Sequence, residues 1–365
     1  MATNIQIPNA RGLTGGSTAT NRQERVNNVK SEIDKNIDAT QARQILLDIS
    51  AQGRHLQGHL RLDGSGGKNN GNLQFSARSN ATLRSAKTEV TGAALKALFE
   101  KAQLPTSALD QYLKGPPGRS APSKISNREI SAIIDKSVQQ QAREKLQASL
   151  GQFRTVSYGG REVGGGARPH GAYIKSGSQS ETLENIRAGF GTLLSIDNSS
   201  ATKDMQAAIP NGLVSQGGPN YEIEDFKAPS VETLTRIRAF VDSEHQAGRD
   251  VMLHCGYGIG RTGTALAALV LADEVKRAKA ANPNLSLASI SAAVQAGEHD
   301  SIELAYDDKG REQLSTGVVP RLVANAIRTV READARAGVP PPGSVETPLQ
   351  LNSLMLYLAH LVEQR

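Results

Sequence analysis

Cysteine, tryptophan and long apolar runs are scarce or missing in this chain of 365 residues. With one cysteine, Cys255, an intramolecular disulfide is impossible, which excludes the disulfide-stapled extracellular class. No stretch approaches the roughly 18 consecutive apolar residues of a membrane span, and the polar start lacks the apolar core of a secretory signal. The sequence therefore predicts a globular protein with no membrane span.

Aromatic residues make up only 4% of the chain, and tryptophan is absent. The excess of 42 lysines and arginines over 36 acidic residues gives a formal charge of +6, which favours anionic partners without selecting one. Because the basic residues do not interleave with aromatic ones, a nucleic-acid partner is not expected.

The N-terminal part divides by composition into three segments. Residues 1–28 are polar, and we expect them to be disordered, either as a frayed terminus or as a non-cleaved export signal. Residues 29–113 predict a small α+β unit, since a helical pattern is followed by two strand candidates and a second helix that stops near Pro105. Residues 114–128 are rich in Pro, Gly and Ser, and we expect a linker there.

Residues 129–365 predict an α/β domain. A first helix leads into a stretch at 153–178 that we expect to be rich in loops. Helix 180–189, strand 191–197, a helix from 230 and strand 250–254 then follow, and the strands are mostly apolar. This pattern is typical of a buried sheet covered by helices.

The stretch HCGYGIGRTGT, residues 254–264, holds the lone cysteine between an apolar strand and an apolar helix. Its glycines let the turn point backbone N–H groups toward one spot beside a helix N-terminus, which favours an oxyanion. A cysteine there is stabilised as a thiolate and becomes a nucleophile, Arg261 can grip two phosphate oxygens, and Thr262 can donate a hydrogen bond to the sulfur. His254 either orients the cysteine and lowers its pKa or is simply held there by packing.

These residues resemble the Cys-x5-Arg-Ser/Thr signature of the protein tyrosine phosphatase superfamily. The resemblance implies a central, mostly parallel sheet flanked by helices. It also implies a phosphocysteine mechanism that needs no metal or other cofactor, with the loop residues binding the phosphate. Those residues are Gly256, Tyr257, Gly258, Ile259 and Gly260.

Phosphoryl transfer to sulfur also needs a group that protonates the leaving oxygen. Asp225, four residues before Pro229 and a predicted helix, resembles the acid of the dual-specificity branch. Glu222 and Glu224 are alternatives, and so is a merely solvated acidic loop. The chain lacks the Trp-Pro-Asp motif of the tyrosine-specific branch, which leaves the closing motion of this loop open.

Near the C-terminus, SVETPLQ precedes an apolar helix and resembles the segment that carries a water-positioning Gln in this superfamily. Gln350 is the candidate for that role, with an exposed helix residue as the alternative. The insertion at about residues 281–320 lengthens the usual stretch, and the sequence assigns it no role.

A weaker resemblance bears on the substrate. The segments around Arg154 and Lys175 resemble the cysteine phytases, which hydrolyse inositol hexakisphosphate, although the Asp-His-x-Trp-Pro acid loop of that family is missing. With Arg168 and Lys227, these cations suit a highly charged ring, so inositol polyphosphate is narrowly favoured. The alternatives are a protein tyrosine or dual-specificity phosphatase acting on host signalling proteins, and a non-catalytic module that binds phosphoproteins.

The N-terminal unit is similar to the secretion and chaperone-binding domains of type III secreted tyrosine phosphatases, through its layout and the segments QILL and ALKALFE. This resemblance implies a bacterial virulence effector that is secreted by a type III system into the host cytoplasm and has a secretion chaperone as partner. We expect a monomer.

Overall fold

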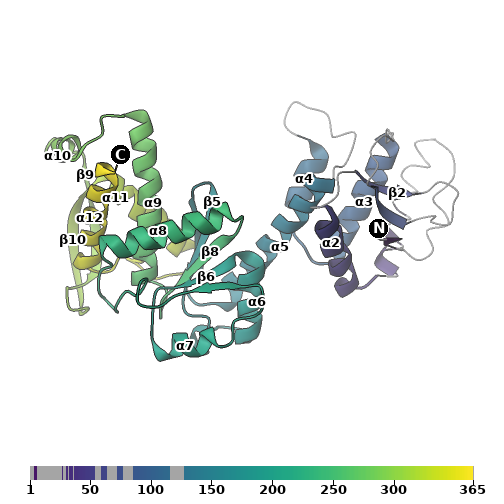
Figure 1. Cartoon of the computed structure of the whole chain (residues 1–365), viewed down its shortest axis with the longest axis horizontal. Helices are drawn as coiled ribbons and strands as arrows, with labels where there is room; N and C mark the ends of the chain where they lie inside the picture. The colour runs from purple at the N-terminus through teal and green to yellow at the C-terminus, as the bar shows by residue number, and fades with distance from the viewer. Residues whose placement is uncertain are drawn as a thin grey trace. The chain divides into compact units, whose positions relative to one another are not determined.

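The computed structural model of this chain (Figure 1) describes residues 4–5, 27, 30–31, 33–35, 37–53, 59–63, 72–76, 85–115 and 127–364. Contacts divide the chain into two compact units, Met1–Gln141 and Ala142–Arg365. No helix in the described ranges has both the length and the apolar character needed to cross a membrane.

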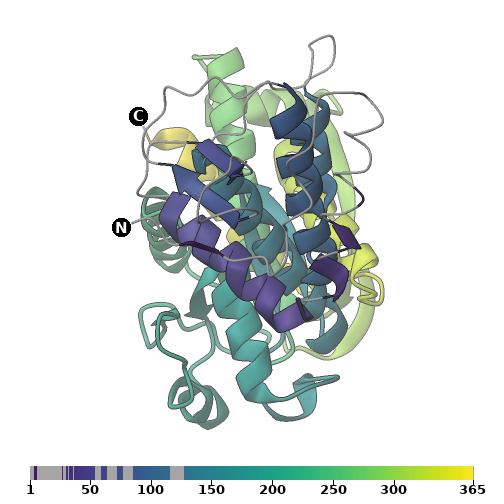
Figure 2. The same ribbon diagram turned by 90° about the vertical axis from the view of Figure 1, so that its right-hand side faces the viewer.

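The first unit, drawn in purple to blue (Figure 1, Figure 2), contains a small antiparallel sheet and several helices. The sheet has the order β1-β3-β2. The apolar core includes Leu46, Leu98 and Phe99. The elements are β1 (Asn4–Ile5), α2 (Ala39–Gly53), β2 (His59–Asp63), β3 (Asn72–Ser76), α3 (Ser85–Lys101), α4 (Ser107–Lys114) and the first part of α5 (Asn127–Ser149).

Two of the predicted segments fall largely on residues that the structure does not describe. The predicted export segment, residues 1–28, lies outside the described residues except at 4–5 and 27, as do residues 116–126 of the predicted linker. The division between the units falls after Gln141, inside α5, rather than at residues 114–128. It falls there because Ile130 and Ile134 of α5 belong to the core of the first unit.

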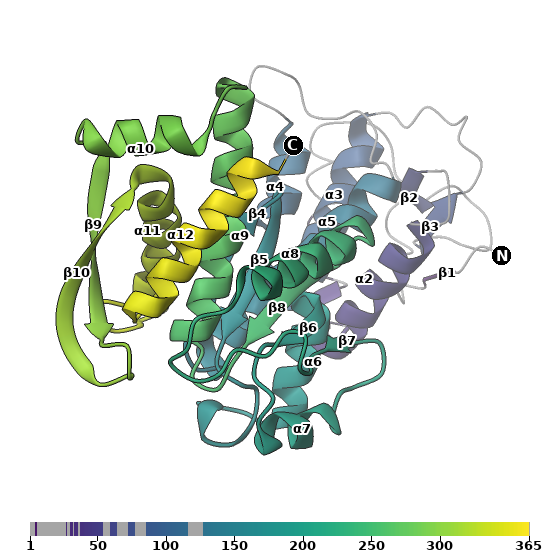
Figure 3. The ribbon, with the colours of Figure 1, turned by 60° about the vertical axis from the view of Figure 1, so that its left-hand side comes forward.

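The second unit is built on a five-stranded sheet of order β4-β5-β8-β6-β7, seen from the side in Figure 3. The pairs β5–β8, β8–β6 and β6–β7 are parallel, and β4 pairs with β5 antiparallel. This confirms the predicted mostly parallel sheet flanked by helices. The strands are β4 (Arg154–Tyr158), β5 (Arg161–Gly166), β6 (Gly191–Ser195), β7 (Val214–Gln216) and β8 (Asp250–His254).

Alternating side chains of β8 point into two separate cores, as a strand covered on both faces requires. Val251 and Leu253 pack into the larger core, together with residues of α8 (Val231–Gln246) and α9 (Gly260–Ala281). Met252 packs into the smaller core, with residues of α6 (Gln179–Gly189) and α7 (Ser200–Gln206).

Three of these flanking helices start at a serine whose hydroxyl accepts a backbone N–H of the first turn, which fixes where each helix begins. The three are Ser178 for α6, Ser199 for α7 and Ser230 for α8.

The stretch expected to be rich in loops contains a β-hairpin, β4–β5, followed by the short 3-10 helix η2 (Gly171–Tyr173). Gly159 and Gly160 connect the two strands with φ of 60° and 76°. Two consecutive residues at positive φ form the two-residue turn that suits a hairpin, and glycine adopts it without strain. The Gly-Gly pair was therefore the sequence signal for this hairpin.

The insertion at residues 281–320 folds as a helix and an antiparallel hairpin within the second unit. It comprises α10 (Leu287–Gln295), β9 (His299–Tyr306) and β10 (Glu312–Pro320). Ile302, Leu304 and Val319 reach the larger core. The chain then continues through α11 (Arg321–Arg336) and α12 (Pro348–Glu363).

Candidate active site

The phosphate loop, residues 255–261, leads from the end of β8 into the first turn of α9, as predicted. Gly258 has a φ of 88°, and a Cβ there would collide with the backbone of Gly166 and Ala167. Only glycine fits this position. The close approach brings the Gly258 N–H to 3.1 Å from the Cys255 sulfur.

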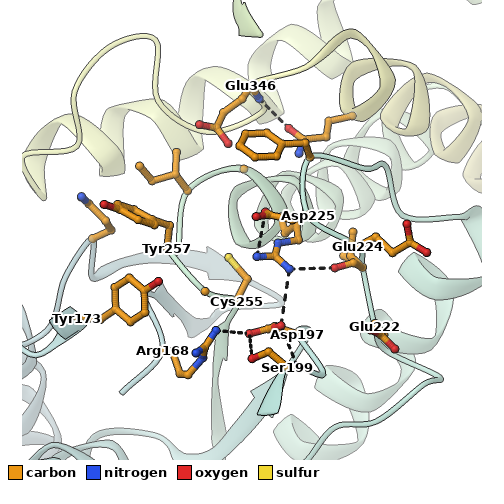
Figure 4. A pocket seen from close by; sticks show the side chains of 18 of the residues that line it. Arg168, Tyr173, Asp197, Ser199, Glu222, Glu224, Asp225, Cys255, Tyr257 and Glu346 are labelled. Atoms are coloured by element: carbon orange, nitrogen blue, oxygen red, sulfur yellow. Dashed lines mark hydrogen bonds and ion pairs between the residues drawn. The ribbon is translucent and has the colours of Figure 1, made fainter. Parts of the chain in front are cut away.

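Cys255 is 2% exposed and lines a cavity of about 780 Å³. The Gly258 amide and the N-terminal end of α9 both stabilise negative charge at the sulfur. The thiol thus lies where a thiolate nucleophile needs to be, at the wall of an open pocket (Figure 4).

Arg154 lies beneath the phosphate loop and not in the pocket, which corrects its predicted role as a substrate-binding cation. Its guanidinium donates to the carbonyls of Gln152 and Gly258 and to the hydroxyl of Ser344, and its Nε lies 2.6 Å from Asp334 Oδ1. Both ions are almost completely buried, so the desolvation of each is offset by the other. Arg154 holds the loop carbonyls from below, so the loop amides are free to face the pocket.

Arg261, the predicted phosphate-binding arginine, holds the acidic wall of the pocket. Its Nη2 lies 3.0 Å from Asp225 Oδ1, and its Nη1 donates to the Ile223 carbonyl at 3.2 Å. Nη1 also lies 3.8 Å from Asp197 Oδ1. The guanidinium is therefore oriented before any phosphate arrives.

Asp197 is a pocket residue that the sequence analysis missed. Its Oδ2 lies 2.7 Å from Arg168 Nη2 and accepts hydrogen bonds from Ser199 and Thr202. Burial opposes ionisation of Asp197, but the Thr202 hydrogen bond and Arg168 outweigh it and hold its pKa below the usual range. The signal was its place just after strand β6, since ligand sites in parallel sheets form at the carboxyl ends of strands.

Asp225, the predicted general acid, is on the loop before α8, with its side chain 67% exposed. The alternatives Glu222 and Glu224 also line the pocket, and Glu222 accepts a hydrogen bond from Asn198 at 3.2 Å. Asp225 is the one of the three with an ion pair to Arg261 among the described contacts (Figure 4). Its carboxyl therefore lies beside Arg261 at the cavity and remains open to the solvent.

His254 is fully buried beneath the loop. Its Nε2 lies 2.7 Å from Ser195 Oγ, and its Nδ1 lies 3.2 Å from the Cys255 carbonyl oxygen. Burial lowers the pKa of His254 to about 4, although the Cys255 carbonyl opposes the shift. The ring is therefore neutral at pH 7, and its contacts give it a positioning role at the loop rather than a role in proton transfer.

The predicted hydrogen bond from Thr262 to the thiol is not formed in this structure. In the part of the chain that the structure describes, its hydroxyl is buried and has no partner, while the Cys255 sulfur accepts from Gly258. Thr262 stands next to the β5 backbone, where its methyl group would crowd a side chain on Gly165.

Gln350 is fully buried and lines the cavity, so the alternative of an exposed helix residue is wrong. Its Oε1 accepts from the backbone of Glu346 and Thr347 as part of the cap of α12. Within the described residues its Nε2 has no partner, and a Cβ on Gly260 would lie 3.0 Å from it. The amide nitrogen therefore faces the start of α9 with its hydrogen-bonding capacity unused.

Glu346 is a second pocket residue that sequence reasoning missed. Its carboxylate approaches Gly260 so closely that a Cβ there would overlap it. Burial raises the pKa of Glu346 to about 7, and the charges of Asp225 and Asp334 add to the shift, against Arg154 and Arg261. Part of this carboxyl population is therefore protonated at neutral pH.

Of the other predicted phosphate and substrate ligands, Gly256, Tyr257, Ile259, Gly260 and Arg168 line the cavity. Lys175 and Lys227 are exposed and lie outside its lining.

Aromatic side chains flank the mouth of the pocket in two pairs. Tyr173 and Tyr257 have ring centroids 5.4 Å apart, and Tyr257 is 65% exposed. Phe226 and Tyr306 form a second edge-to-face pair, also at 5.4 Å. All four rings line the cavity.

A comparison with protein families agrees with this geometry. Residues 170–274 match the family model described as "Polymorphic toxin system, DSP-PTPase phosphatase". No curated protein matches this chain.

Similar solved structures are phosphatases. Tk-PTP in its active form is 20% identical, covering 54% of this chain and 90% of its own, with a TM-score of 0.31. Kinase associated phosphatase, with its catalytic cysteine substituted by serine, is 13% identical, covering 58% and 97%, with a TM-score of 0.38. The tyrosine phosphatase OH1 from the Orf virus is 11% identical, covering 62% and 97%, with a TM-score of 0.31. The family match and the geometry of the cysteine loop identify the site as that of a cysteine-dependent phosphatase of the protein tyrosine or dual-specificity type.

Proposed function

We propose that this chain hydrolyses phosphomonoesters in two steps through a phosphocysteine. The Cys255 thiolate attacks phosphorus, the bond from phosphorus to the leaving oxygen breaks, and protonated Asp225 gives its proton to that oxygen. Asp225 then takes a proton from water as the water attacks phosphorus, which releases phosphate and restores the thiolate. The observation that carries this proposal is the pairing of Arg261 with Asp225, 3.0 Å apart, in the pocket that Cys255 lines.

The buried amide of Gln350 fits the second step. Its Nε2 has no partner among the described residues and faces Gly260 at the pocket. An unpaired buried donor is costly unless a ligand or water satisfies it. We infer that Nε2 orients the water that attacks the phosphocysteine.

The charge of the pocket bears on the substrate. Two arginines, Arg168 and Arg261, line it, and both are already paired with carboxylates. The acidic lining residues are Asp197, Glu222, Glu224, Asp225 and Glu346. This balance suits a single phosphate group better than an inositol polyphosphate, whose further phosphates would face carboxylates.

The aromatic rim favours an aryl ester. Tyr173 and Tyr257 offer faces and edges against which a phenol ring can pack, and such ring pairs add roughly 0.5–1.5 kcal/mol beyond burial. We therefore propose phosphotyrosine in a protein or peptide as the substrate, and inositol hexakisphosphate becomes the second candidate. It is kept because the segments around Arg154 and Lys175 resemble the phytases in sequence, although neither side chain lines the pocket.

We further propose that the phosphatase acts inside a cell other than the one that makes it. The name of the matched family, which refers to a polymorphic toxin system, supports delivery of this kind. The type III route and the secretion chaperone depend on the resemblance of the N-terminal unit alone, and the family match begins only at residue 170. Co-purification of the full chain with a small chaperone expressed from the same genome would test that route.

Phosphate release by the full chain tests the catalytic proposal. A phosphotyrosine peptide, a phosphoserine peptide and inositol hexakisphosphate are compared at equal concentration, with Cys255→Ser as the blank. We expect release from the phosphotyrosine peptide and a fall on the order of 10⁴-fold or more in Cys255→Ser. Release from the inositol alone would overturn the substrate assignment, and tight peptide binding without release would favour a non-catalytic module.

A further inference from the structure

The hairpin of the insertion touches the loop that carries Asp225. Phe226, the next residue, packs its ring edge-to-face on Tyr306 at the end of β9, with centroids 5.4 Å apart and an interplanar angle of 62°. Tyr306 itself lines the catalytic cavity. A segment to which the sequence assigned no role therefore supplies part of the site.

The turn between β9 and β10 is shaped to receive the Phe226 ring. Gly310 has a φ of 74°, and a Cβ at this position would lie 2.6 Å from Phe226 Cγ. Asp307 fixes the turn, because its Oδ1 accepts the backbone N–H groups of Lys309 and Arg311. Any side chain at position 310 would displace the phenyl ring.

The hairpin is anchored on its other side to the segment that carries Gln350. The N–H groups of Ala305 and Tyr306 both donate to the carbonyl of Glu346, at 3.1 and 3.0 Å. Ile302 and Leu304 of β9 are buried in the larger core. The hairpin is thus a fixed surface against which a loop can rest.

The loop, in contrast, has a conformation that needs support. Phe226 has a φ of 58°, a region that a bulky residue adopts only when its surroundings impose it. Asp225 is largely exposed, and among the described residues it forms an ion pair with Arg261. The ring contact with Tyr306 is the packing interaction next to Asp225 that can hold this backbone.

We propose that the β9–β10 hairpin is the docking surface of the acid loop, and that Phe226, Tyr306 and Gly310 are positioning residues that keep Asp225 where it can protonate the leaving group. The inference rests on the proposed phosphatase function, because it assigns an action to the insertion within that same site.

Dependence on the leaving group tests this role. A phenol of low pKa leaves without help, whereas a phenol of high pKa needs the acid. In Phe226→Ala we expect kcat/KM for phenyl phosphate to fall on the order of tenfold or more, and that for 4-nitrophenyl phosphate to change less than about twofold. Gly310→Val should give the same pattern, because its side chain would occupy the place of the ring.

Two further variants complete the design. Phe226→Tyr keeps the ring and should restore the wild-type ratio of the two substrates. Leu314→Ala removes a side chain of the same hairpin that is 78% exposed and should leave both rates unchanged.

An equal loss on both substrates in Phe226→Ala and Gly310→Val, or no loss in either, would overturn the docking role. If one of the two variants fails to fold, the other still decides. Failure of the wild-type chain to hydrolyse either ester would instead overturn the proposed function, so the two failures are distinguishable.

Discussion

The two loops that meet at the pocket are built in opposite ways. The phosphate loop, residues 255–261, is held from beneath by buried groups, with Arg154 bonded to the Gly258 carbonyl and His254 to the Cys255 carbonyl. The acid loop, residues 221–229, is mostly exposed, and Asp225, its proposed general acid, is joined to the pocket by one ion pair among the described residues. In the roles proposed above, the nucleophile Cys255 is thus fixed in advance, whereas the proton donor Asp225 depends on neighbours from another part of the chain.

This difference between the two loops matches the chemistry proposed for each of them. Stabilising charge on a phosphoryl group requires donors that need no reorganisation when the reaction occurs, and a buried network provides them. A proton donor must let substrate enter and product leave, so a loop that rests on a separate surface suits it better. Variants in the buried support of the phosphate loop should therefore lose stability, whereas variants in the acid loop should lose activity alone.

The largest effect is expected from Arg154→Met. It leaves the buried carboxylate of Asp334 without its cation and removes the tie to the Gly258 carbonyl. Breaking a buried ion pair in this way costs about 3–5 kcal/mol. Urea unfolding of the full chain should show a loss of this size, and kcat should fall with it.

The double variant Arg154→Met/Asp334→Asn separates the two roles of Arg154. Removing the stranded charge should recover much of the unfolding free energy, since the amide oxygen can still accept from Ser344. Because the loop carbonyls stay untied, kcat should remain low. Recovery of stability and kcat together would mean that Arg154 serves only to balance Asp334.

Asp225→Asn should lower activity without lowering stability, whereas Arg154→Met should lower both. We expect kcat for phenyl phosphate to fall about 10²- to 10⁴-fold, because the general acid is lost. The free energy of unfolding should hardly change, since the side chain is 67% exposed. Glu222→Gln and Glu224→Gln are the matched controls, and an equal fall in either would transfer the role of general acid to that residue.

The phosphate loop could be predicted in detail because its requirements are local. Cys255, its glycines and Arg261 follow one another between a strand and a helix, and the chemistry depends on backbone geometry that glycine determines. The mostly parallel sheet was predictable for a similar reason, since apolar strands and helical patterns alternate along the sequence.

Other parts of the site could not be predicted because they depend on contacts between residues distant in sequence. Arg154 was predicted to bind substrate, and only the fold places Asp334, 180 positions later, against it. Phe226 and Tyr306 are 80 positions apart, and no local pattern links them. Charged residues within the folded core are recognised by their partners, which composition and spacing do not reveal.

Glu346 lies between the two loops and should link pH to stability. Its carboxyl has a pKa of about 7 in the folded chain against an ordinary value of 4.5, so the folded state binds the proton more tightly. Stability is therefore lost as the pH rises from about 4.5 to 7, and the loss is complete above that range. Glu346→Gln should raise the unfolding free energy at pH 8 by on the order of 1–3 kcal/mol and leave it nearly unchanged at pH 4. A gain of the same size at both values would assign the effect to packing instead.

The smallest effects are expected from Lys175→Ala and Lys227→Ala. Both lysines lie outside the lining of the cavity, so the phosphate meets Arg261 and the loop amides rather than either ammonium group. Both lysines are exposed, and salt screens exposed charges, so KM for the phosphotyrosine peptide should change less than about twofold. Arg168→Lys is the comparison, and in this variant KM should change more than in the two lysine variants. Arg168 lines the cavity and pairs with Asp197, and a compact ammonium cannot reproduce the planar contact of the guanidinium. A rise in KM for inositol hexakisphosphate in the lysine variants, with the peptide unaffected, would restore the basic surface as a polyphosphate site separate from the catalytic pocket.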